Sequence, residues 1–360
     1  MTDPGRLGVD ADPAFPSGPL EGGPEAAAQQ TPSGGGGAGR VLDVVHSALR
    51  RPASGAMIGT ALMFVTFSLV ASPNFLTLPS MASTFTLAAE LGIVAMGVTI
   101  LMIAGEFDLS VGSVLGVSSV TVPWLAERGW PVAAAIPVAL LVAISIGLLN
   151  GIVVNRTRVP SFIVTLGALF WWRGVLFAVT RGFPISVDRD DPAFNLFSTR
   201  LASGFNVSLF WFVAVTAILT LVVVRTRFGN WTFATGGNER TADQLGIPTK
   251  RVKLVLFALA AFLAGLAGII QAGRFSGVDS LRGTAMELEA VAAAVIGGTR
   301  LSGGYGSVIG TAFGCIMLGI IQNGLVLAGI AGYWYRAFIG LLIVLVVIVN
   351  QRGGRVTPPA

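Results

Sequence analysis

Long apolar runs recur along this chain of 360 residues, and they constrain its fold more than any other feature. Hydrophobic residues make up 53% of the sequence and charged residues only 11%. An ordinary soluble domain carries roughly 25% charged residues, so this chain lacks the polar side chains to cover a water-facing surface. A helix of about 20 apolar residues crosses a bilayer. The sequence therefore predicts an all-α integral membrane protein, a polytopic bundle of about ten transmembrane helices.

Short polar turns divide the predicted membrane domain, residues 51–350, into its spans. The segment 287–299 is short and begins with two acids, so we expect a tilted or broken helix there. Without that crossing, Arg352 and Arg355 would lie on the side of the membrane that basic residues avoid. The spans are predicted at 55–71, 80–104, 109–126, 131–154, 161–180, 207–224, 254–273, 287–299, 307–327 and 333–349.

Basic residues set the predicted orientation, because cytoplasmic loops carry an excess of Lys and Arg. Arg50 and Arg51 precede the first span, and the loop 225–253 holds six basic residues against two acidic ones. Both termini are therefore expected in the cytoplasm. Residues 1–50 are rich in Gly, Pro and Ala, which predicts a disordered cytoplasmic tail, and residues 351–360 form a second cytoplasmic tail.

The sparse reactive residues exclude several classes of protein. Cys315 is the single cysteine and His46 the single histidine, so no thiolate metal site, no H-E-x-x-H motif and no serine hydrolase site can form. The sequence has no nucleotide-binding phosphate loop either. The net charge of +5 comes from basic residues beside apolar runs, which membrane topology explains better than nucleic-acid binding. We predict no enzymatic activity, no metal and no cofactor.

Glycines spaced four apart occur within four predicted spans. Small residues at this spacing let helix backbones approach closely, which matters where lipid supplies no hydrophobic driving force. A chain with 47 glycines also produces such pairs by chance, but we predict close helix packing at them. The pairs are Gly55/Gly59, Gly112/Gly116, Gly147/Gly151 and Gly310/Gly314.

Polar groups in and between the spans are candidates for the transport path. Glu106, Asp108 and Ser110 interrupt the apolar sequence between the second and third spans. Charged side chains at membrane depth cost free energy and usually serve a function, which favours a direct role in transport. Asp and Ser also cap the starts of helices. Both transport and helix capping therefore stay open for these residues. Asn150, with Gln322 and Asn323, places amides inside spans, where interhelical hydrogen bonds are favoured over contact with a polar substrate.

A short helix is predicted at 239–245, ended by Gly246 and Pro248. On the cytoplasmic side it is a candidate docking element for another protein, and an ordinary turn in the headgroup region is the alternative. A later glycine-rich run, 297–310, does not predict a dinucleotide-binding loop, because no strand pattern precedes it and an apolar helix follows.

Four motifs in register resemble the permease family of ribose- and xylose-type ATP-binding-cassette importers, a family shared with branched-chain amino acid importers. They are A-G-E-F-D-L-S-V-G-S-V, V-P-S-F-I-V-T-L-G-A-L, G-G-N-E and A-V-I-G-G-T-R-L-S-G-G-Y-G-S-V-I-G-T. The resemblance covers about residues 55–350. This chain departs from the family at Glu106-Phe107, where many members have a glycine-isoleucine pair.

The resemblance implies a homodimer of ten-span subunits in lipid, in the inner (plasma) membrane of a bacterium. A periplasmic or surface-tethered sugar-binding protein would deliver a simple sugar, and a cytoplasmic ATPase pair would drive import by alternating access. The segment near 239–245 would be the helix that contacts the ATPase. The residues assigned to it are Gly236, Gly237, Asn238, Glu239, Ala242, Leu245 and Gly246.

A secondary transporter of a small polar solute, driven by an ion gradient, is the alternative class. Such a protein needs acids or broken helices near the membrane midplane. The acids that could serve an ion site are Glu90, Glu106, Asp108, Glu287 and Glu289.

Overall fold

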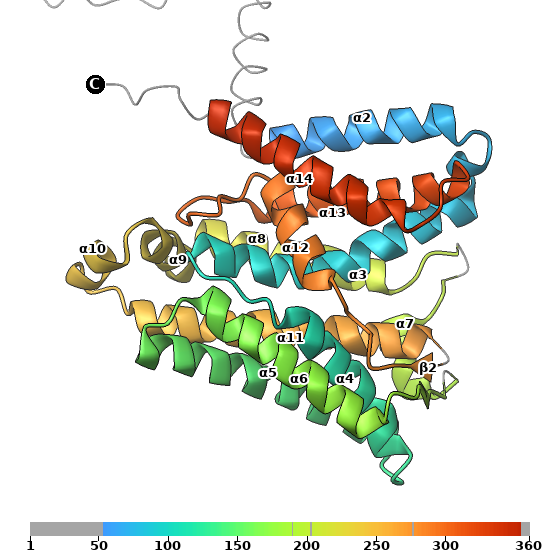
Figure 1. Cartoon of the computed structure of the whole chain (residues 1–360), viewed down its shortest axis with the longest axis horizontal. Helices are drawn as coiled ribbons and strands as arrows, with labels where there is room; N and C mark the ends of the chain where they lie inside the picture. The colour runs from blue at the N-terminus through green and yellow to red at the C-terminus, as the bar shows by residue number, and fades with distance from the viewer. Residues whose placement is uncertain (1–52, 189, 202–203, 276, 354–360) are drawn as a thin grey trace, which may run out of the picture. The chain divides into compact units, whose positions relative to one another are not determined.

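The computed structural model describes residues 53–353, apart from 189, 202–203 and 276 (Figure 1). The predicted tail 1–50 lies outside the described residues, and the last helix extends three residues into the predicted tail 351–360. Strands are minor among the described residues: β1 (Ile185–Ser186) pairs antiparallel with β2 (Gly277–Val278), with Ile185 opposite Val278. The described part of the chain is helical, as the apolar runs predict.

A helix occupies each of the ten predicted span positions. Six are long and apolar enough to cross a membrane: α3 (Leu78–Ile103), α5 (Val132–Thr157), α6 (Ser161–Thr180), α8 (Ser208–Arg225), α11 (Thr249–Arg274) and α13 (Val308–Leu327). The others are α2 (Ser54–Val70), α4 (Val111–Ala126), α12 (Met286–Ile296) and α14 (Trp334–Gly353). With 11 residues, α12 is shorter than a full crossing of about 20, in agreement with the broken helix expected there.

Two helices form the centre of the bundle. α3 is buried along nearly its whole length and packs against α8, α11, α12 and α13. α11 packs against α4 and α5 on its other side (Figure 1). The fully buried Phe257 lies within α11. Because these two helices have apolar residues on all sides, they are stable only when other helices cover them. Some polar residues of these helices, among them Glu90 on α3 and Lys253 on α11, are consequently buried.

Peripheral helices expose large apolar side chains. Leu69 on α2, Trp171 on α6 and Phe210 on α8 are 77%, 69% and 69% exposed. Each of these helices exposes several more large apolar side chains, whereas water-soluble monomers rarely expose large groups of them. These faces therefore need an apolar environment, as expected for a protein embedded in a membrane.

The predicted close packing is confirmed at three of the four Gly-x-x-x-Gly pairs. A Cβ atom at Gly147 would overlap the backbone of Phe257 and the side chain of Ala261 on α11. Gly112 and Gly116 pack on the segment before α12, and Gly310 and Gly314 pack on α12 and the residue after it. In the first pair Gly55 has open space around it and Gly59 lies near only the side chain of Met317, so this pair makes no close backbone contact.

The predicted loop 225–253 contains more helix than its polarity suggested. α9 (Arg227–Gly237) follows α8 after a single residue, Thr226, whose side chain accepts a hydrogen bond of 3.2 Å from Gly229 N and so caps the new helix. α10 (Glu239–Gln244) comes next, and α11 begins at Thr249. The predicted loop is therefore a pair of short helices that lead into α11.

The opposite end of α11 adjoins the polar stretch 181–206, which packs on it through α7 (Asn195–Ser198). This stretch also holds β1 and the 3-10 helix η2 (Pro192–Phe194), and a second 3-10 helix, η1 (Asn74–Leu76), joins α2 to α3. α11 thus connects two distinct ends of the bundle, one with α9 and α10, the other with α7 and β2.

Replacing Gly147 with leucine should destabilise the protein, because the backbone of Phe257 cannot move aside easily. Overpacking of this kind costs about 1–3 kcal/mol. The melting temperature of the purified protein in detergent should fall for Gly147→Leu and stay near the wild-type value for Gly167→Leu, since Gly167 on α6 has no atom within reach of an added Cβ. Equal melting temperatures for the two variants would contradict the α5–α11 contact.

Candidate functional site

The predicted short helix at 239–245 is confirmed as α10. Asn238 precedes it, and its side-chain oxygen accepts a hydrogen bond of 3.0 Å from Thr241 N. Gly246 ends it in the left-handed conformation, with φ of +82°, which favours glycine. Ala242 is buried beneath the helix, whereas Leu245 is 76% exposed. α10 therefore presents an isolated apolar side chain at the surface.

Gly236 and Gly237, at the end of α9, lie where three segments meet. A Cβ at Gly236 would overlap the carbonyl of Ile103 at the end of α3 and the backbone of Gly304. The Gly304 amide also donates a hydrogen bond of 2.9 Å to the Ile103 carbonyl. The glycine-rich run 297–310 therefore serves as a packing surface for α9 and α3, which agrees with rejecting a nucleotide-binding role.

The interruption at 104–110 between α3 and α4 is held by α6. Phe107 N donates to Ser161 Oγ at 3.0 Å, and Leu109 N donates to Thr165 Oγ1 at 3.1 Å. Buried backbone amides need such partners. The motif V-P-S-F-I-V-T thus supplies, through two hydroxyls one helical turn apart, the acceptors that the A-G-E-F-D-L-S motif requires.

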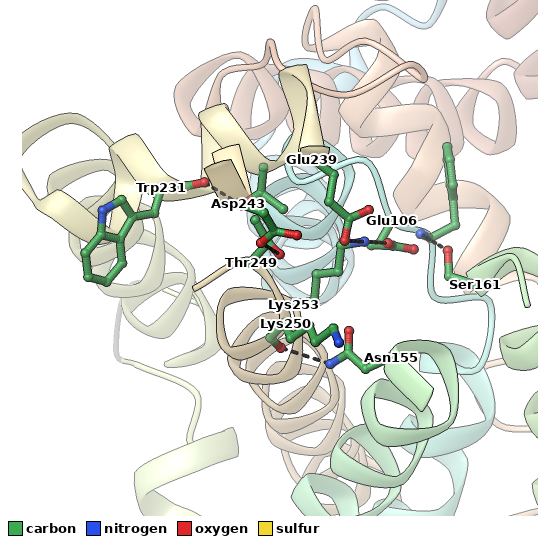
Figure 2. A network of polar contacts seen from close by, with 11 residues as sticks. Glu106, Asn155, Ser161, Trp231, Glu239, Asp243, Thr249, Lys250 and Lys253 are labelled. Carbon is green, nitrogen blue, oxygen red and sulfur yellow. Dashed lines mark hydrogen bonds and ion pairs between the residues drawn. The ribbon is translucent and has the colours of Figure 1, made fainter. Parts of the chain in front are cut away.

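Lys253 joins this interruption to α10 (Figure 2). Its Nζ lies 2.6 Å from Glu106 Oε1 and 2.7 Å from Glu239 Oε1. The side chains of Lys253 and Glu106 are 9% and 11% exposed, and that of Glu239 is 46% exposed. A buried charge is tolerated when it is paired, so one ammonium neutralises a buried carboxylate of the interruption and also contacts the first residue of α10.

A polar cavity of about 530 Å³ opens beside this network. Next to it, the Asn155 amide donates to the Lys250 carbonyl at 2.9 Å and ties α5 to α11, and Thr249 Oγ1 donates to Asp243 Oδ1 at 2.5 Å (Figure 2). Acidic and basic groups both line the cavity. Besides the network they include Asn155, Arg158, Ser161, Arg240, Asp243 and Lys250.

Asp108, Ser110 and Asn150 form a separate buried cluster. The Asn150 amide donates to Ser110 Oγ at 2.9 Å, and Ser110 Oγ donates to Asp108 Oδ1 at 2.6 Å. Asp108 also accepts from Ser110 N at 2.8 Å. Ser110 precedes α4 but its side chain does not cap that helix. Of the capping roles left open for these two residues, the one for Ser110 is wrong, because its hydroxyl donates to the Asp108 carboxylate. Asp108 does accept a backbone amide just before α4, that of Ser110.

Gln322 and Asn323, adjacent on α13, face different surroundings. The Asn323 amide donates to Ser80 Oγ and Thr84 Oγ1 of α3, both at 2.9 Å, which confirms an interhelical bond at this position. Gln322 lines another cavity, shared with Glu90 and Arg274. The predicted polar residues therefore separate into several groups, and only Glu106 joins the α10 network.

Some residues of these groups were not singled out from the sequence. In the sequence, Lys253 was only one of six basic residues in the loop 225–253. Ser161 and Thr165 had no feature that distinguished them from the other residues of their predicted span. A lysine near the start of an apolar helix is a usable signal, because a charge there needs a partner. In the described part of the chain no three His, Cys, Asp or Glu side chains gather in a group that could hold a metal ion.

Four sequence motifs thus meet at one end of a helical bundle with six membrane-length helices, an architecture that defines a polytopic membrane protein. The chain belongs to the family described as branched-chain amino acid transport system / permease component, whose model matches residues 80–347. The permease family predicted from the motifs is confirmed.

Relatives with specific names cover most of the chain. It is 32% identical over 284 residues to the ribose import permease protein RbsC of Escherichia coli (strain K12), across 78% of this chain and 88% of that protein. It is 32% identical over 298 residues to RbsC of Bacillus subtilis (strain 168), across 83% and 92%. It is 33% identical over 300 residues to the autoinducer 2 import system permease protein LsrC of Yersinia pseudotuberculosis, across 82% and 84%.

Replacing Lys253 with methionine should leave Glu106 as a buried, unpaired carboxylate. Breaking a buried pair in this way costs about 3–5 kcal/mol, so the melting temperature of the purified protein should fall markedly. The double variant Lys253→Met with Glu106→Gln should recover most of the loss, because the unpaired charge is gone. Glu239→Gln should change stability by about 0–1 kcal/mol, since that carboxylate is half exposed.

A melting temperature for Lys253→Met equal to that of Glu239→Gln would contradict the burial of the Glu106–Lys253 pair. Failure of the double variant to recover stability would show that Lys253 acts through its packing instead of its charge.

Proposed function

We propose that this chain is the permease subunit of an ATP-binding-cassette importer and forms the translocation path for a simple sugar. Its relatives are named for the import of ribose and of autoinducer 2, which supports a small polyhydroxylated substrate. The subunit performs no covalent chemistry. A separate cytoplasmic ATPase hydrolyses ATP, and ATP binding favours one of two conformations through its different contacts with each.

The contacts that link α10 to the interior of the bundle support this function. Leu245 is exposed at the end of α10, and Glu239 at its start contacts Lys253, which also binds Glu106 of the interruption between α3 and α4. A protein that binds Leu245 and moves α10 would therefore also displace α11 and the 104–110 segment. This is the connection that an ATPase-coupling helix needs, and we assign that role to Gly236–Gly246.

The proposed orientation has ten crossings with both termini in the cytoplasm of a bacterium, in its inner (plasma) membrane. α9, α10 and the start of α11 lie on the cytoplasmic side, consistent with the basic residues of 225–253. α7 and the β1–β2 pair then lie outside, where a sugar-binding protein docks. The exposed apolar faces of α2, α6 and α8 contact lipid or a second copy of the chain, because the working unit is a homodimer.

An ion-gradient-driven carrier is less well supported by the same geometry. Glu106 is paired with Lys253, and Glu90 is paired with Arg274, so two of the five candidate acids are already neutralised by bases. A third, Asp108, accepts two hydrogen bonds from Ser110. Glu287 and Glu289 are the remaining two, and neither makes an ion pair with a described residue, so an ion site would have to be built on those two acids.

A cysteine at position 245 tests both the docking role and the orientation. Leu245→Cys should react with a membrane-impermeant maleimide only in inside-out vesicles, because Leu245 is exposed and cytoplasmic in this proposal. After labelling, the tagged chain should no longer retain an ATPase during purification in mild detergent. The single native cysteine, Cys315, is buried and gives little background.

The matched control is Leu196→Cys on α7, which is 62% exposed at the opposite end of α11. It should react only in right-side-out vesicles and keep the ATPase after labelling. Reaction of both cysteines from the same side would overturn the orientation, and an ATPase retained by the labelled Leu245→Cys protein would overturn the docking role.

A further inference from the structure

A second polar cavity lies inside the bundle, away from α10. It measures about 150 Å³ and lies among α3, α11, α12 and α13. That volume is below the range of about 300–1,000 Å³ typical for drug-sized ligands, which suits a solute of monosaccharide size. Six charged or amide side chains line it: Glu90, Gln271, Arg274, Arg282, Glu289 and Gln322.

Its position fits a station on a path through the membrane. Glu90 lies near the middle of α3, thirteen residues before Ile103, or about 20 Å along the helix axis at 1.5 Å per residue. Gln271 and Arg274 are at the end of α11 remote from Lys253. Substrate sites of transporters commonly lie near the bilayer midplane, between helices.

Two wider cavities adjoin it. One, of about 500 Å³, shares Gln271, Arg282 and Glu289 with it. Another, of about 490 Å³, shares Arg274 and reaches Arg200 of the stretch 181–206. Both extend toward the end of the bundle that holds α7 and β2, which is the side where substrate arrives in the proposed orientation.

The strongest charges in the cavity neutralise each other. Arg274 Nη2 donates to Glu90 Oε2 at 2.9 Å, and Arg274 Nε lies 2.7 Å from Glu90 Oε1 as an ion contact. Glu90 is only 2% exposed, so its carboxylate requires this partner. The guanidinium groups of Arg274 and Arg282 both pack on the Phe275 ring, 4.2 and 4.3 Å from its centroid, in cation–π contacts.

Other polar groups remain available to a ligand. The side chains of Gln322 and Glu289 make no hydrogen bond or ion pair with any described residue. The Gln271 amide interacts with Glu90 and also faces the cavity. An amide both donates and accepts, and a carboxylate accepts. Together they match sugar hydroxyls, each of which donates and accepts.

We propose that this cavity binds the sugar during passage, with Gln322, Gln271 and Glu289 hydrogen-bonding to its hydroxyl groups. The inference rests on the proposed function and names the residues by which the permease itself recognises a neutral polyhydroxylated solute. The paired Glu90 and Arg274 form the floor of the site and hold α3 against α11.

The test compares uptake of labelled ribose and 2-deoxyribose by cells that carry the whole importer, at concentrations that saturate the binding protein. The wild type should take up ribose faster than its deoxy analogue. Gln322→Leu keeps the side-chain size but removes the amide, so ribose uptake should fall about tenfold. The ratio of the ribose uptake rate to the 2-deoxyribose uptake rate should also fall toward one, because the amide that hydrogen-bonds to the hydroxyl group is missing.

The matched control is Asn323→Leu, one residue away, whose amide bonds to α3 instead of facing the cavity. It should lower both uptake rates equally and leave their ratio unchanged. A Gln322→Leu protein with the wild-type ratio would overturn this inference while the proposed function stands. A wild-type importer that moves branched-chain amino acids and neither sugar would overturn the proposed function itself.

Discussion

Buried backbone groups must find hydrogen-bond partners, and this requirement shapes the end of the bundle that contains α10. Two breaks between helices, at 104–110 and at 297–307, meet at this end, and buried backbone in each of them has a hydrogen-bond partner. Hydroxyls of Ser161 and Thr165 satisfy the first, and Gly304 pairs with the end of α3. The four sequence motifs therefore pack together at one end of the bundle, where one motif supplies hydrogen-bond acceptors for the backbone amides of another.

Charge connects that construction to the rest of the molecule along α11. Lys253 near its start is shared by two carboxylates, and Arg274 at its end holds Glu90 of α3. Between these two residues α11 is apolar apart from Gln271 and packs on α3, α4 and α5, so this helix carries an ion pair near each end. In the proposed function, movement at α10 would reach the polar cavity through this helix and would couple contact with an ATPase to passage of a sugar.

The sequence was sufficient for the helices but not for their polar contacts. Apolar runs predicted a helix at each of the ten span positions, of which six are long and apolar enough to cross a membrane. Gly246 with Pro248 marked the end of α10, because these signals are local. α9 was missed since its only strong signal is the Thr226 cap. The Glu106–Lys253 pair joins residues that are far apart in sequence, and no local pattern identifies such partners. The cavity around Gln322 depends in the same way on how four helices assemble.

Whether the chain imports sugar with energy from ATP is measured most directly as sugar accumulation in liposomes. These liposomes contain the purified chain with its copurified ATPase and a sugar-binding protein. The account predicts that labelled ribose accumulates only when ATP reaches the ATPase and the binding protein is present, with no response to a proton ionophore. Accumulation by the chain alone, without ATP and abolished by the ionophore, would contradict the account and identify a gradient-driven carrier.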